Sequence, residues 1–529
     1  MFRLALFLSV IGAIVGVGIW ALSQNSILAG TGEVRLVPLG TYETRSFNQS
    51  GSEGVAYDAV RQRVFVVNAE ANSLDILDIT QPVTPRKVAE VSLDDYGSGV
   101  NAVAVNGETV AVVVEGSSKQ ALGQVVFFDL DGNELSSLFV GSLPDHVAFT
   151  PDGRFVLVAN EGEPNDAYTL DPEGSITVIN MQAGAAEVSI NDVRTVRFSG
   201  LAIADLPPDL RIAKPDAAPA NDLEPEYIAV APGGTTAYVT LQENNAVAIL
   251  DIPSATLKRI VPLGFKSFQI DPIDASDKDG KINIRTWPVF GMYQPDAIAA
   301  FEDEGTLYFA IANEGDSRDY EAFSEEARVG ELTLDPAAFP EAEDLQLDRN
   351  LGRLKVATTL GDVDNDGDYD ALYAFGGRSF SIWDADSDEM VFDSASQFER
   401  FLAVLSPDTF NSTNESNKSF DDRSDDKGPE PEGIVIGVVN DKRYAFIGLE
   451  RIGGVMVYDI SNPREPELTT YFNRRNFDGE PESFTADDLG PEGLAFVPAD
   501  QSPTGEALLI VGNEISGTTS IFAVRAGEE

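Results

Sequence analysis

Short hydrophobic runs separated by polar turns recur along the chain. In residues 428–460, GPEPEGIVIGVVNDKRYAFIGLERIGGVMVYDI, a turn around Glu432 opens the first run, the second run ends on Glu450, and glycines lead into a third. Apolar runs of this length, rich in Val, Ile, Phe and Tyr and bounded by turn residues, are typical of antiparallel strands. The pattern therefore predicts a small sheet in which each strand pairs with the next.

The same unit returns along the chain, which indicates a repeat architecture. Its opening turns lie near residues 53, 100, 144, 225, 295, 431 and 491. One such sheet cannot bury both of its faces, and four-stranded units stacked around an axis form a β-propeller. The sequence therefore predicts an all-β fold, a β-propeller of seven blades. A two-sheet sandwich would not explain the recurrence.

Two regions bear on the number of blades and on how the ring closes. Residues 353–394 contain four short apolar runs, which either complete the fifth blade or form an eighth. The last unit lacks a fourth strand, whereas residues 34–42 form an apolar run ahead of the first unit. Pairing these two would remove exposed sheet edges, so we expect an N-terminal strand to close the propeller.

Residues 1–29 are predicted to be a targeting segment. Arg3 precedes an almost unbroken apolar run over 4–22, and small residues near Ala29 offer a cleavage point. The run is also close to the length that spans a bilayer, so a cleaved signal peptide and an uncleaved N-terminal anchor both stay open. In either case residues 30–529 are expected to be one exported domain, periplasmic, secreted or at the cell surface, with 4–22 as its possible membrane tether.

Composition narrows the classes of partner and chemistry. The 529 residues carry 87 Asp and Glu against 36 Lys and Arg, a net charge of −51. Nucleic acids and anionic membrane surfaces demand basic patches, so neither is expected as a partner. The chain has no Cys, which excludes disulfides and thiolate nucleophiles, and one His, His146. That residue is either a ligand or base in the channel or an ordinary turn histidine.

Many acids fall at equivalent positions of the repeats. Antiparallel neighbours place the start of one strand beside the end of the next, so acids at the opening turns and at the ends of the second strands gather at one channel mouth. Crowded carboxylates repel unless a cation or proton relieves them, and hard oxygen ligands suit Ca²⁺ or Mg²⁺. The alternative is a structural role, in which these acids cap strands by accepting hydrogen bonds from neighbouring backbone N–H groups. The opening acids are Glu53, Asp145, Glu226, Asp296, Glu432 and Glu492; the strand-end acids are Glu70, Glu115, Glu161, Glu243, Glu314, Glu450 and Glu514.

From the strand-end acids we select Glu70, Glu161, Glu450 and Glu514 as channel metal ligands. Neighbouring asparagines could add amide oxygens, at Asn68, Asn160, Asn313 and Asn513. The identity of the channel ion, Ca²⁺ or Mg²⁺, stays open.

A second cation motif lies outside the repeats. Residues 362–370 read D-x-D-x-D-G-x-x-D, in which alternate acids converge on one ion and the glycine permits a sharp turn. It lies between predicted strands, so it resembles the hairpin calcium loops of integrin-type propeller blades more than an EF-hand. The predicted structural Ca²⁺ ligands are Asp362, Asp364, Asp366 and Asp370, with Asp368 as a further one. A weaker acidic motif of the same kind is formed by Asp274, Asp277 and Asp279.

Long insertions between the strands mark the expected functional face. They cover residues 201–223, 265–294, 315–350, 397–429 and 473–490, and long loops on a rigid scaffold usually carry function. Glu314, Asp316 and Arg318 lie together where the 315–350 insertion begins and are our candidate catalytic residues, because an Arg beside acids can hold a phosphate. Further cations near similar turns are Arg378, Arg423, Lys427 and Arg451, and each is equally explained by an ordinary salt bridge.

Three motifs carry a family resemblance. They are NEGDSRDY at 313–320, AFGGRSFSIWD at 374–384 and DDRSDDKGPEPEGI at 421–434. Together they resemble the choice-of-anchor I family, which includes mesenchyme-specific cell-surface glycoproteins and bacterial proteins labelled atypical alkaline phosphatases. The resemblance implies a propeller but no established catalytic residues. The family's C-terminal anchors vary, and residues 524–529 show no apolar tail.

Two functions follow as hypotheses. In the first, the protein is a metal-dependent phosphatase whose channel metals activate water toward a small phosphoester. In the second, it is a non-catalytic calcium-binding surface or envelope protein whose acidic face grips a mineral, a surface polymer or a protein. Adaptation to high salt would account for the acidity alone.

Overall fold

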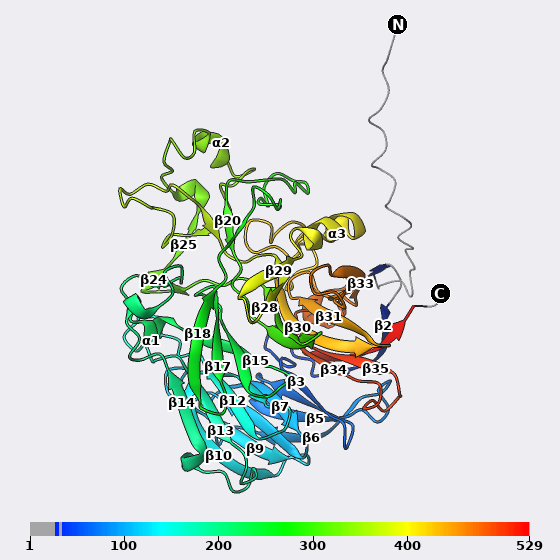
Figure 1. Cartoon of the computed structure of the whole chain (residues 1–529). Coiled ribbons are helices and arrows are strands. Elements are labelled where there is room, and N and C mark those ends of the chain that lie inside the picture. The colour runs from blue at the N-terminus through cyan, green and yellow to red at the C-terminus, as the bar shows by residue number, and fades with distance from the viewer. Residues whose placement is uncertain (1–26, 31–33, 528–529) are drawn as a thin grey trace.

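The chain folds into a β-propeller, seen in Figure 1 as successive sheets around a common centre. The computed structural model describes residues 27–30 and 34–527. Within them, seven sheets are each built on four antiparallel strands, ordered from the inside outward. The first four sheets are β3 Val55–Asp58, β4 Arg63–Asn68, β5 Ser73–Asp78 and β6 Arg86–Ser92; β7 Val100–Asn106, β8 Thr109–Val114, β9 Leu122–Asp129 and β10 Glu134–Ser142; β11 Pro144–Phe149, β12 Phe155–Asn160, β13 Ser175–Asn180 and β14 Val193–Arg197; β15 Pro225–Val230, β16 Thr236–Leu241, β17 Ala246–Asp251 and β18 Thr256–Pro262.

The remaining three sheets follow in the same inside-to-outside order. They are β21 Ile298–Asp303, β22 Thr306–Asn313, β28 Ser379–Asp384 and β29 Glu389–Asp393; β30 Pro431–Val439, β31 Lys442–Leu449, β32 Val455–Asp459 and β33 Glu467–Asn473; β34 Pro491–Val497, β35 Ala507–Asn513, β36 Thr518–Ala526 and β2 Val34–Glu43. A short strand, β1 Ile27–Gly30, pairs with β33 at the outside of the sixth sheet.

The ring closes as predicted. Strand β2 pairs antiparallel with β36 over its whole length, from Val34 opposite Ala526 to Glu43 opposite Thr518. Each inner strand lies against the inner strand of the next sheet, and β34 lies against β3, so the last sheet meets the first. Among the described strands, every sheet of the ring therefore has a neighbouring sheet on both of its faces, and only outer edges remain, as is usual in propellers.

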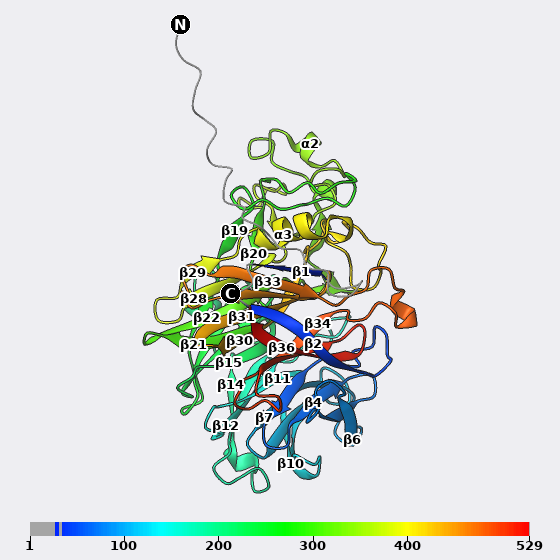
Figure 2. The ribbon, with the colours of Figure 1, turned by 90° about the vertical axis from the view of Figure 1, so that its right-hand side faces the viewer.

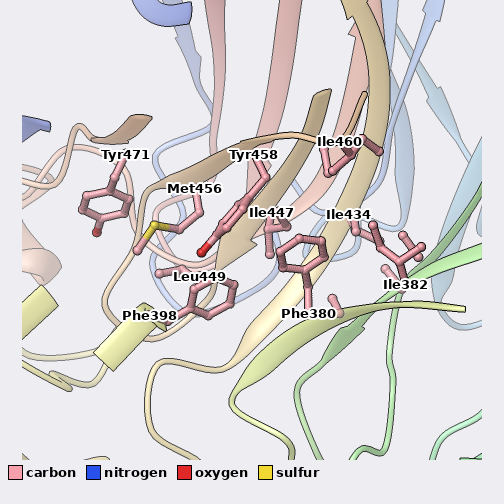
Figure 3. Close-up of a cluster of buried hydrophobic side chains, with 14 of the residues drawn as sticks. Phe380, Ile382, Phe398, Ile434, Ile447, Leu449, Met456, Tyr458, Ile460 and Tyr471 are labelled. Atoms are coloured by element: carbon pink, nitrogen blue, oxygen red, sulfur yellow. The ribbon is translucent and has the colours of Figure 1, made fainter. Parts of the chain in front are cut away.

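Hydrophobic clusters fill every junction between neighbouring sheets. The second and third strands of each sheet are almost wholly buried because both of their faces pack on a neighbour, which explains their unbroken apolar runs. Figure 3 shows the junction of the fifth and sixth sheets, where Ile382 and Phe380 meet Ile434, Ile447 and Tyr458. The repeat pattern is thus a direct consequence of radial packing.

Replacing Ile382 by valine removes one buried methylene from this junction. Ile382 is fully buried, so we expect a loss of about 1 kcal/mol in the free energy of unfolding. The control is Val404→Ala, since Val404 is 84% exposed and should change stability by less than about 0.5 kcal/mol. Equal denaturation midpoints for the two variants would contradict the packing described here.

Residues 353–394 divide between the fifth sheet and an insertion. Strands β28 and β29 complete the fifth sheet by pairing onto β22. The runs before them join a separate five-stranded sheet built from two insertions, with a hydrophobic centre that includes Trp287, Val329 and Leu354. Its strands are β19 Phe265–Ser267, β20 Phe290–Met292, β27 Tyr373–Ala374, β26 Lys355–Ala357 and β25 Glu326–Arg328; β23 Asp319–Tyr320 and β24 Phe323–Ser324 form a small hairpin.

Helices are few and lie in the insertions. Figures 1 and 2 both show α2, β20 and α3 together beyond one side of the propeller sheets. The helices are α1 Pro219–Asp222, α2 Ala342–Leu345 and α3 Gln397–Leu405, with 3₁₀ turns η1 Ile190–Asp192, η2 Ile203–Asp205, η3 Val329–Glu331, η4 Pro407–Thr409 and η5 Pro481–Ser483. Among the described residues none of these helices is long and apolar enough to span a bilayer. Of the predicted targeting segment, residues 1–26 lie outside the described residues, and residues 27–29 belong to β1.

Candidate cation site in the propeller channel

Bulges at the starts of the inner strands set the acidic side chains apart from the regular ladder. In β15 the pairing passes from Pro225 opposite Leu241 to Ile228 opposite Val239, so Glu226 lies in the irregular step. Asp145, Glu432 and Glu492 occupy the corresponding steps of β11, β30 and β34. A β-bulge re-aims side chains where it occurs, and this explains why the opening acids of separate repeats converge.

Two glycines let the inner strands come close enough to form a narrow channel. A Cβ atom on Gly433 would lie 2.1 Å from the backbone oxygen of Glu492, and one on Gly493 would lie 2.3 Å from the backbone oxygen of Glu53. Both distances are far below van der Waals contact. The Glu-Gly pair of the repeat therefore combines a carboxylate with the close backbone approach that crowds it against its neighbours.

The channel encloses a cavity of about 170 Å³. Acids reach it from several sheets, and Asn101 stands where the second unit has no acid. Burial, followed by the charges of Glu514 and Asp145, raises the pKa of Glu53 to about 8. Burial, followed by the charge of Glu163, raises the pKa of Asp145 to about 6. The polar residues lining it are Glu53, Asn101, Asp145, His146, Asp296 and Glu492.

Several opening acids have other acids as their neighbours. The charges that act most strongly on Glu53, Glu226, Glu432 and Glu492 are all those of carboxylates. Burial and these charges raise the pKa values of Glu226, Glu432 and Glu492 well above their usual range. In the described residues, one oxygen of each of these three is buried without a hydrogen-bond partner. Such groups need a proton or a cation.

Elsewhere in the channel the protein supplies its own cations. Lys427 contacts Glu314 at 2.8 Å and Glu430 at 3.2 Å, and Arg451 contacts Glu430 and Glu450 at 3.0 Å each. Burial opposes ionisation of Glu430, but the charges of Lys427, Arg423 and Arg451 hold its pKa well below the usual range. Glu450, a predicted metal ligand, is thus already paired with an arginine.

Two other predicted channel ligands lie apart from the closest groups of carboxylates. Glu70 is exposed, because Ala69 takes the position directly after β4. Glu514 accepts a hydrogen bond from Ser50 at 3.5 Å, and burial raises its pKa. Neither belongs to a group of acids whose ligand atoms approach within 4.8 Å in the described residues.

Glu161, the fourth predicted channel ligand, does belong to such a group. It approaches Glu226 and Glu243, with one ligand atom from each lying within 4.8 Å of the others. Two further groups are Asp296 with Glu314 and Glu432, and Glu314 with Glu430 and Glu450. The carboxylate cluster expected at the channel mouth is therefore present, but its members divide between metal-like and ion-paired surroundings.

The candidate catalytic residues occupy different surroundings. Arg318 is buried, contacts Glu224 at 2.7 Å and donates to the backbone oxygen of Asp222 at 3.0 Å. These contacts favour a structural part for Arg318 over phosphate binding. Glu314 contacts Lys427 and accepts a hydrogen bond from Gln242 at 3.0 Å. Asp316 is exposed, and its backbone oxygen accepts a hydrogen bond from Gln294.

The remaining cations singled out in the sequence form ordinary ion pairs. Arg378 contacts buried Glu399 at 2.7 Å, and Arg423 contacts Glu430 at 2.6 Å. His146 lies in the channel wall, stacked on Tyr227 with ring centroids 3.8 Å apart. Burial lowers the pKa of His146 to about 3, so its imidazole is neutral at physiological pH.

The 362–370 loop has the compact form expected of a cation loop. Carboxylate oxygens of Asp362, Asp364 and Asp370 come within 4.8 Å of one another. The backbone N–H groups of Asp366 and Gly367 donate to Asp362, which holds the turn. The Asp366 charge raises the pKa of Asp364. Asp366 and Asp368 lie in the same loop but outside the closest three; Asp366 accepts a hydrogen bond from the backbone of Asp368.

In the weaker acidic motif, Asp274 and Asp277 are bonded to groups of the protein itself. Asp277 contacts Lys278 and, at 2.8 Å, Arg353. Asp274 is buried and accepts backbone hydrogen bonds from Ser276 and Asn283, and burial raises its pKa to about 7.

The asparagines at the strand ends hold the next strand. Asn160 donates to the backbone oxygen of Ser175 at 3.0 Å and accepts from the backbone of Gly141. Asn313 donates to Ser379 at 3.1 Å.

Sequence reasoning missed two buried glutamates whose ion pairs affect how negative charge is balanced in the site. Glu224 pairs with Arg318, and Glu430 pairs with Arg423, Lys427 and Arg451. A signal for both was present, since the tripeptide Glu-Pro-Glu opens the fourth and sixth units, at 224–226 and 430–432. In each, the first glutamate pairs with an arginine of an insertion, and the second lies at the bulge of the inner strand.

Fold and site together define a β-propeller with a carboxylate-lined centre. A family model described as the choice-of-anchor I domain matches residues 53–463. The chain therefore belongs to the choice-of-anchor I family.

The chain is similar to two relatives and to one solved structure. Gigasin-3a of Magallana gigas is 35% identical over 195 residues, 34% of this chain and 67% of that protein. The mesenchyme-specific cell surface glycoprotein of Strongylocentrotus purpuratus is 28% identical over 275 residues, 45% of this chain and 35% of that protein, so the match spans about a third of that relative. Kuenenia stuttgartiensis hydrazine synthase aligns over 90% of this chain and 96% of that chain, with 13% identity and a TM-score of 0.46.

Proposed function

We propose that this protein is an exported β-propeller that binds divalent cations through its channel acids and its 362–370 loop, and that it acts as a calcium-binding surface protein. The observation that carries the proposal is the set of channel carboxylates, Glu226, Glu432 and Glu492, whose strongest charged neighbours are other acids and which keep a buried oxygen without a partner. Oxygen-rich, anionic surroundings of this kind suit Ca²⁺ or Mg²⁺.

Export rests on two further supports. The sequence before the propeller has the form of a signal peptide or N-terminal anchor, and a relative is named a cell surface glycoprotein. A mineral surface and an acidic polymer bridged by calcium are the partners that fit a chain with a net charge of −51.

Phosphatase activity is the second candidate. Asp316 favours it, since this acid reaches the surface, and desolvation, aided by the charges of Glu243 and Glu314 and opposed by that of Lys427, raises its pKa to about 7. Against it stands Arg318, which is engaged with Glu224. Metal-activated water would supply the nucleophile for phosphoester hydrolysis, and Lys427 would replace Arg318 as the cation nearest the phosphate.

Calorimetric titration of the chelator-treated protein with Ca²⁺ and Mg²⁺ tests the proposal. We expect saturable binding in the wild type and in Glu108→Gln, because Glu108 is exposed, and fewer bound ions in the double variant Glu432→Gln with Glu492→Gln. Absence of binding by the wild type would refute the proposal. Metal-dependent hydrolysis of p-nitrophenyl phosphate that is lost in Asp316→Asn would favour the phosphatase instead.

A further inference from the structure

The three carboxylate groups of the channel differ in how their charge is balanced. Lys427 contacts Glu314, which belongs to two of the groups, and Arg451 contacts Glu430 and Glu450 in one of these two. In the group of Glu314, Glu430 and Glu450, Lys427 and Arg451 therefore already balance the charge as a metal ion would. In the group of Asp296, Glu314 and Glu432, only Glu314 has an ion-pair partner among the described residues. The third group is Glu161, Glu226 and Glu243, and in the described residues it has no such ion pair.

This third group has the properties of an unfilled oxygen site. Glu226 and Glu243 are 7% and 5% exposed, and the Oε2 atom of each is buried without a hydrogen-bond partner in the described residues. The three carboxylates offer ligand atoms within 4.8 Å of one another. Buried carboxylates at this separation repel strongly unless a cation or a proton lies between them.

The nearby arginines are committed to other acids. Arg318 contacts Glu224 at 2.7 Å, and both are at most 1% exposed. Arg211 is paired with Glu325, and it meets Glu243 through the backbone oxygen, leaving the carboxylate free. The fold thus pairs these arginines directly with Glu224 and Glu325. The charge of Arg318 also acts on Glu243, where it opposes the rise in pKa that burial causes, but in the described residues neither arginine forms an ion pair with the triad of Glu161, Glu226 and Glu243.

We propose that Glu161, Glu226 and Glu243 form a divalent-cation site between the third and fourth sheets, with a preference for a hard ion of the Ca²⁺ class. The inference rests on the proposed function and adds to it a particular site. Each ligand comes from a different connection, after β12, at the bulge of β15 and after β16, so the bound ion would tie the two sheets together at their inner ends.

A small hairpin packed on the loop that follows Glu161 provides a reporter. The β23–β24 hairpin is joined to the loop after Glu161 by a backbone hydrogen bond of 2.9 Å from Ala322 to Asp166. Tyr320 of the hairpin packs edge-on against Tyr168, with ring centroids 5.3 Å apart. Burial, and then the charges of Glu163, Glu224, Glu243 and Glu161, raises the pKa of Tyr320. We therefore expect the Tyr320 ring to report an ion bound by the triad.

Terbium luminescence tests the site directly, because Tb³⁺ replaces Ca²⁺ at oxygen sites and is excited through a nearby tyrosine. The full chain is used with Asp364→Asn, which removes the loop's contribution, and calcium affinity is measured in parallel by calorimetry. We expect tyrosine-sensitised emission that added Ca²⁺ displaces. Glu226→Gln and Glu243→Gln should each weaken Ca²⁺ binding at least about tenfold, whereas Glu108→Gln should not.

The Tyr320→Phe variant distinguishes loss of the tyrosine that excites Tb³⁺ from loss of the bound ion. It should lose most of the sensitised emission while keeping the calcium affinity of its parent. Since glutamine has the shape of glutamate and carries no charge, the melting temperature of Glu226→Gln in chelator should equal or exceed that of the parent, which excludes misfolding as the cause.

The two proposals fail in different ways. A wild type that binds neither Ca²⁺ nor Tb³⁺ refutes the proposed function and this site with it. A wild type that binds ions, with Glu226→Gln and Glu243→Gln indistinguishable from Glu108→Gln, refutes the triad site alone.

Discussion

Replacing Arg318 by alanine is expected to lower the free energy of unfolding by about 3–5 kcal/mol. The reason is that Glu224, 0% exposed, would lose its partner at 2.7 Å and remain as an uncompensated buried charge. The guanidinium also donates to the backbone oxygen of Asp222. Chemical denaturation near neutral pH, followed by tryptophan fluorescence and by circular dichroism, measures the loss.

A matched exposed pair provides the control. Arg349 contacts Asp344 at 3.4 Å, with side chains 62% and 65% exposed, and such pairs contribute little. Arg349→Ala should therefore change stability by less than about 0.5 kcal/mol. Adding Glu224→Gln to Arg318→Ala should recover part of the loss, because it removes the stranded charge. An Arg318→Ala variant that is as stable as the wild type but has lost phosphoester hydrolysis would contradict this structural role and would support a catalytic one.

Without divalent cations the protein is expected to become less stable as the pH rises from about 5 to about 8.5. Burial and neighbouring acids raise the pKa of Glu53 from 4.5 to about 8 and that of Asp145 from 3.8 to about 6. A carboxyl group whose pKa is higher in the folded state stabilises that state below its unfolded pKa, and this contribution is lost as the pH rises through the folded pKa. The slope is up to about 1.4 kcal/mol per pH unit for each proton.

Acids with a lowered pKa act in the other direction but outside this range. Glu430, held ionised by Lys427, Arg423 and Arg451, contributes stability above its ordinary value of 4.5 and loses it only at lower pH. His146, whose pKa is lowered to about 3, is neutral throughout the range when folded. An unfolded histidine gains a proton below about 6.5, so His146 by itself makes the folded state more stable as the pH rises toward that value. The expected net decline requires that the opposite effect of the channel acids be larger.

Denaturant midpoints measured in chelator and in Ca²⁺ across this range check the expectation. Calcium should flatten the decline, because a bound ion replaces the protons that relieve the channel acids. Glu53→Gln should reduce the slope in chelator, and exposed Glu108→Gln should leave it unchanged. A chelated protein that keeps or gains stability up to pH of about 8.5 would show that the channel acids are not crowded as described.

Much of the architecture followed from local pattern. Strands such as β4, β12 and β31 were predictable because their apolar runs are bounded by turn residues and buried on both faces. Closure by β2 was predictable because the last repeat lacks a strand that the residues before the first repeat supply. Strands β26 and β27 look like the other strands in sequence, and only their partners in the insertion sheet separate them from the fifth sheet.

The candidate site was predictable as a class of residue and not as a set of partners. The repeat placed acids at the inner strand starts, and the bulges of β15, β30 and β34 bring them together. Which acids are balanced by arginine or lysine depends on insertions more than a hundred residues away, as with Lys427 and Glu314. Sequence spacing carries no record of such contacts, so Arg318 was assigned to phosphate although it pairs with Glu224. Glu450 was assigned to a metal although the next residue, Arg451, contacts it.

By itself, the sequence determined that sheets of antiparallel strands repeat around a ring and that a carboxylate recurs at the mouth of the channel. Both features are periodic, and a periodic feature can be recognised from the spacing of residues along the chain. Tertiary structure alone decided which carboxylates meet a cation from the chain and which, like Glu226 and Glu243, are buried with an oxygen unpartnered in the described residues. The physical reason is that charge balance depends on distance in space, and the distances here are set by how long insertions fold back over the ring.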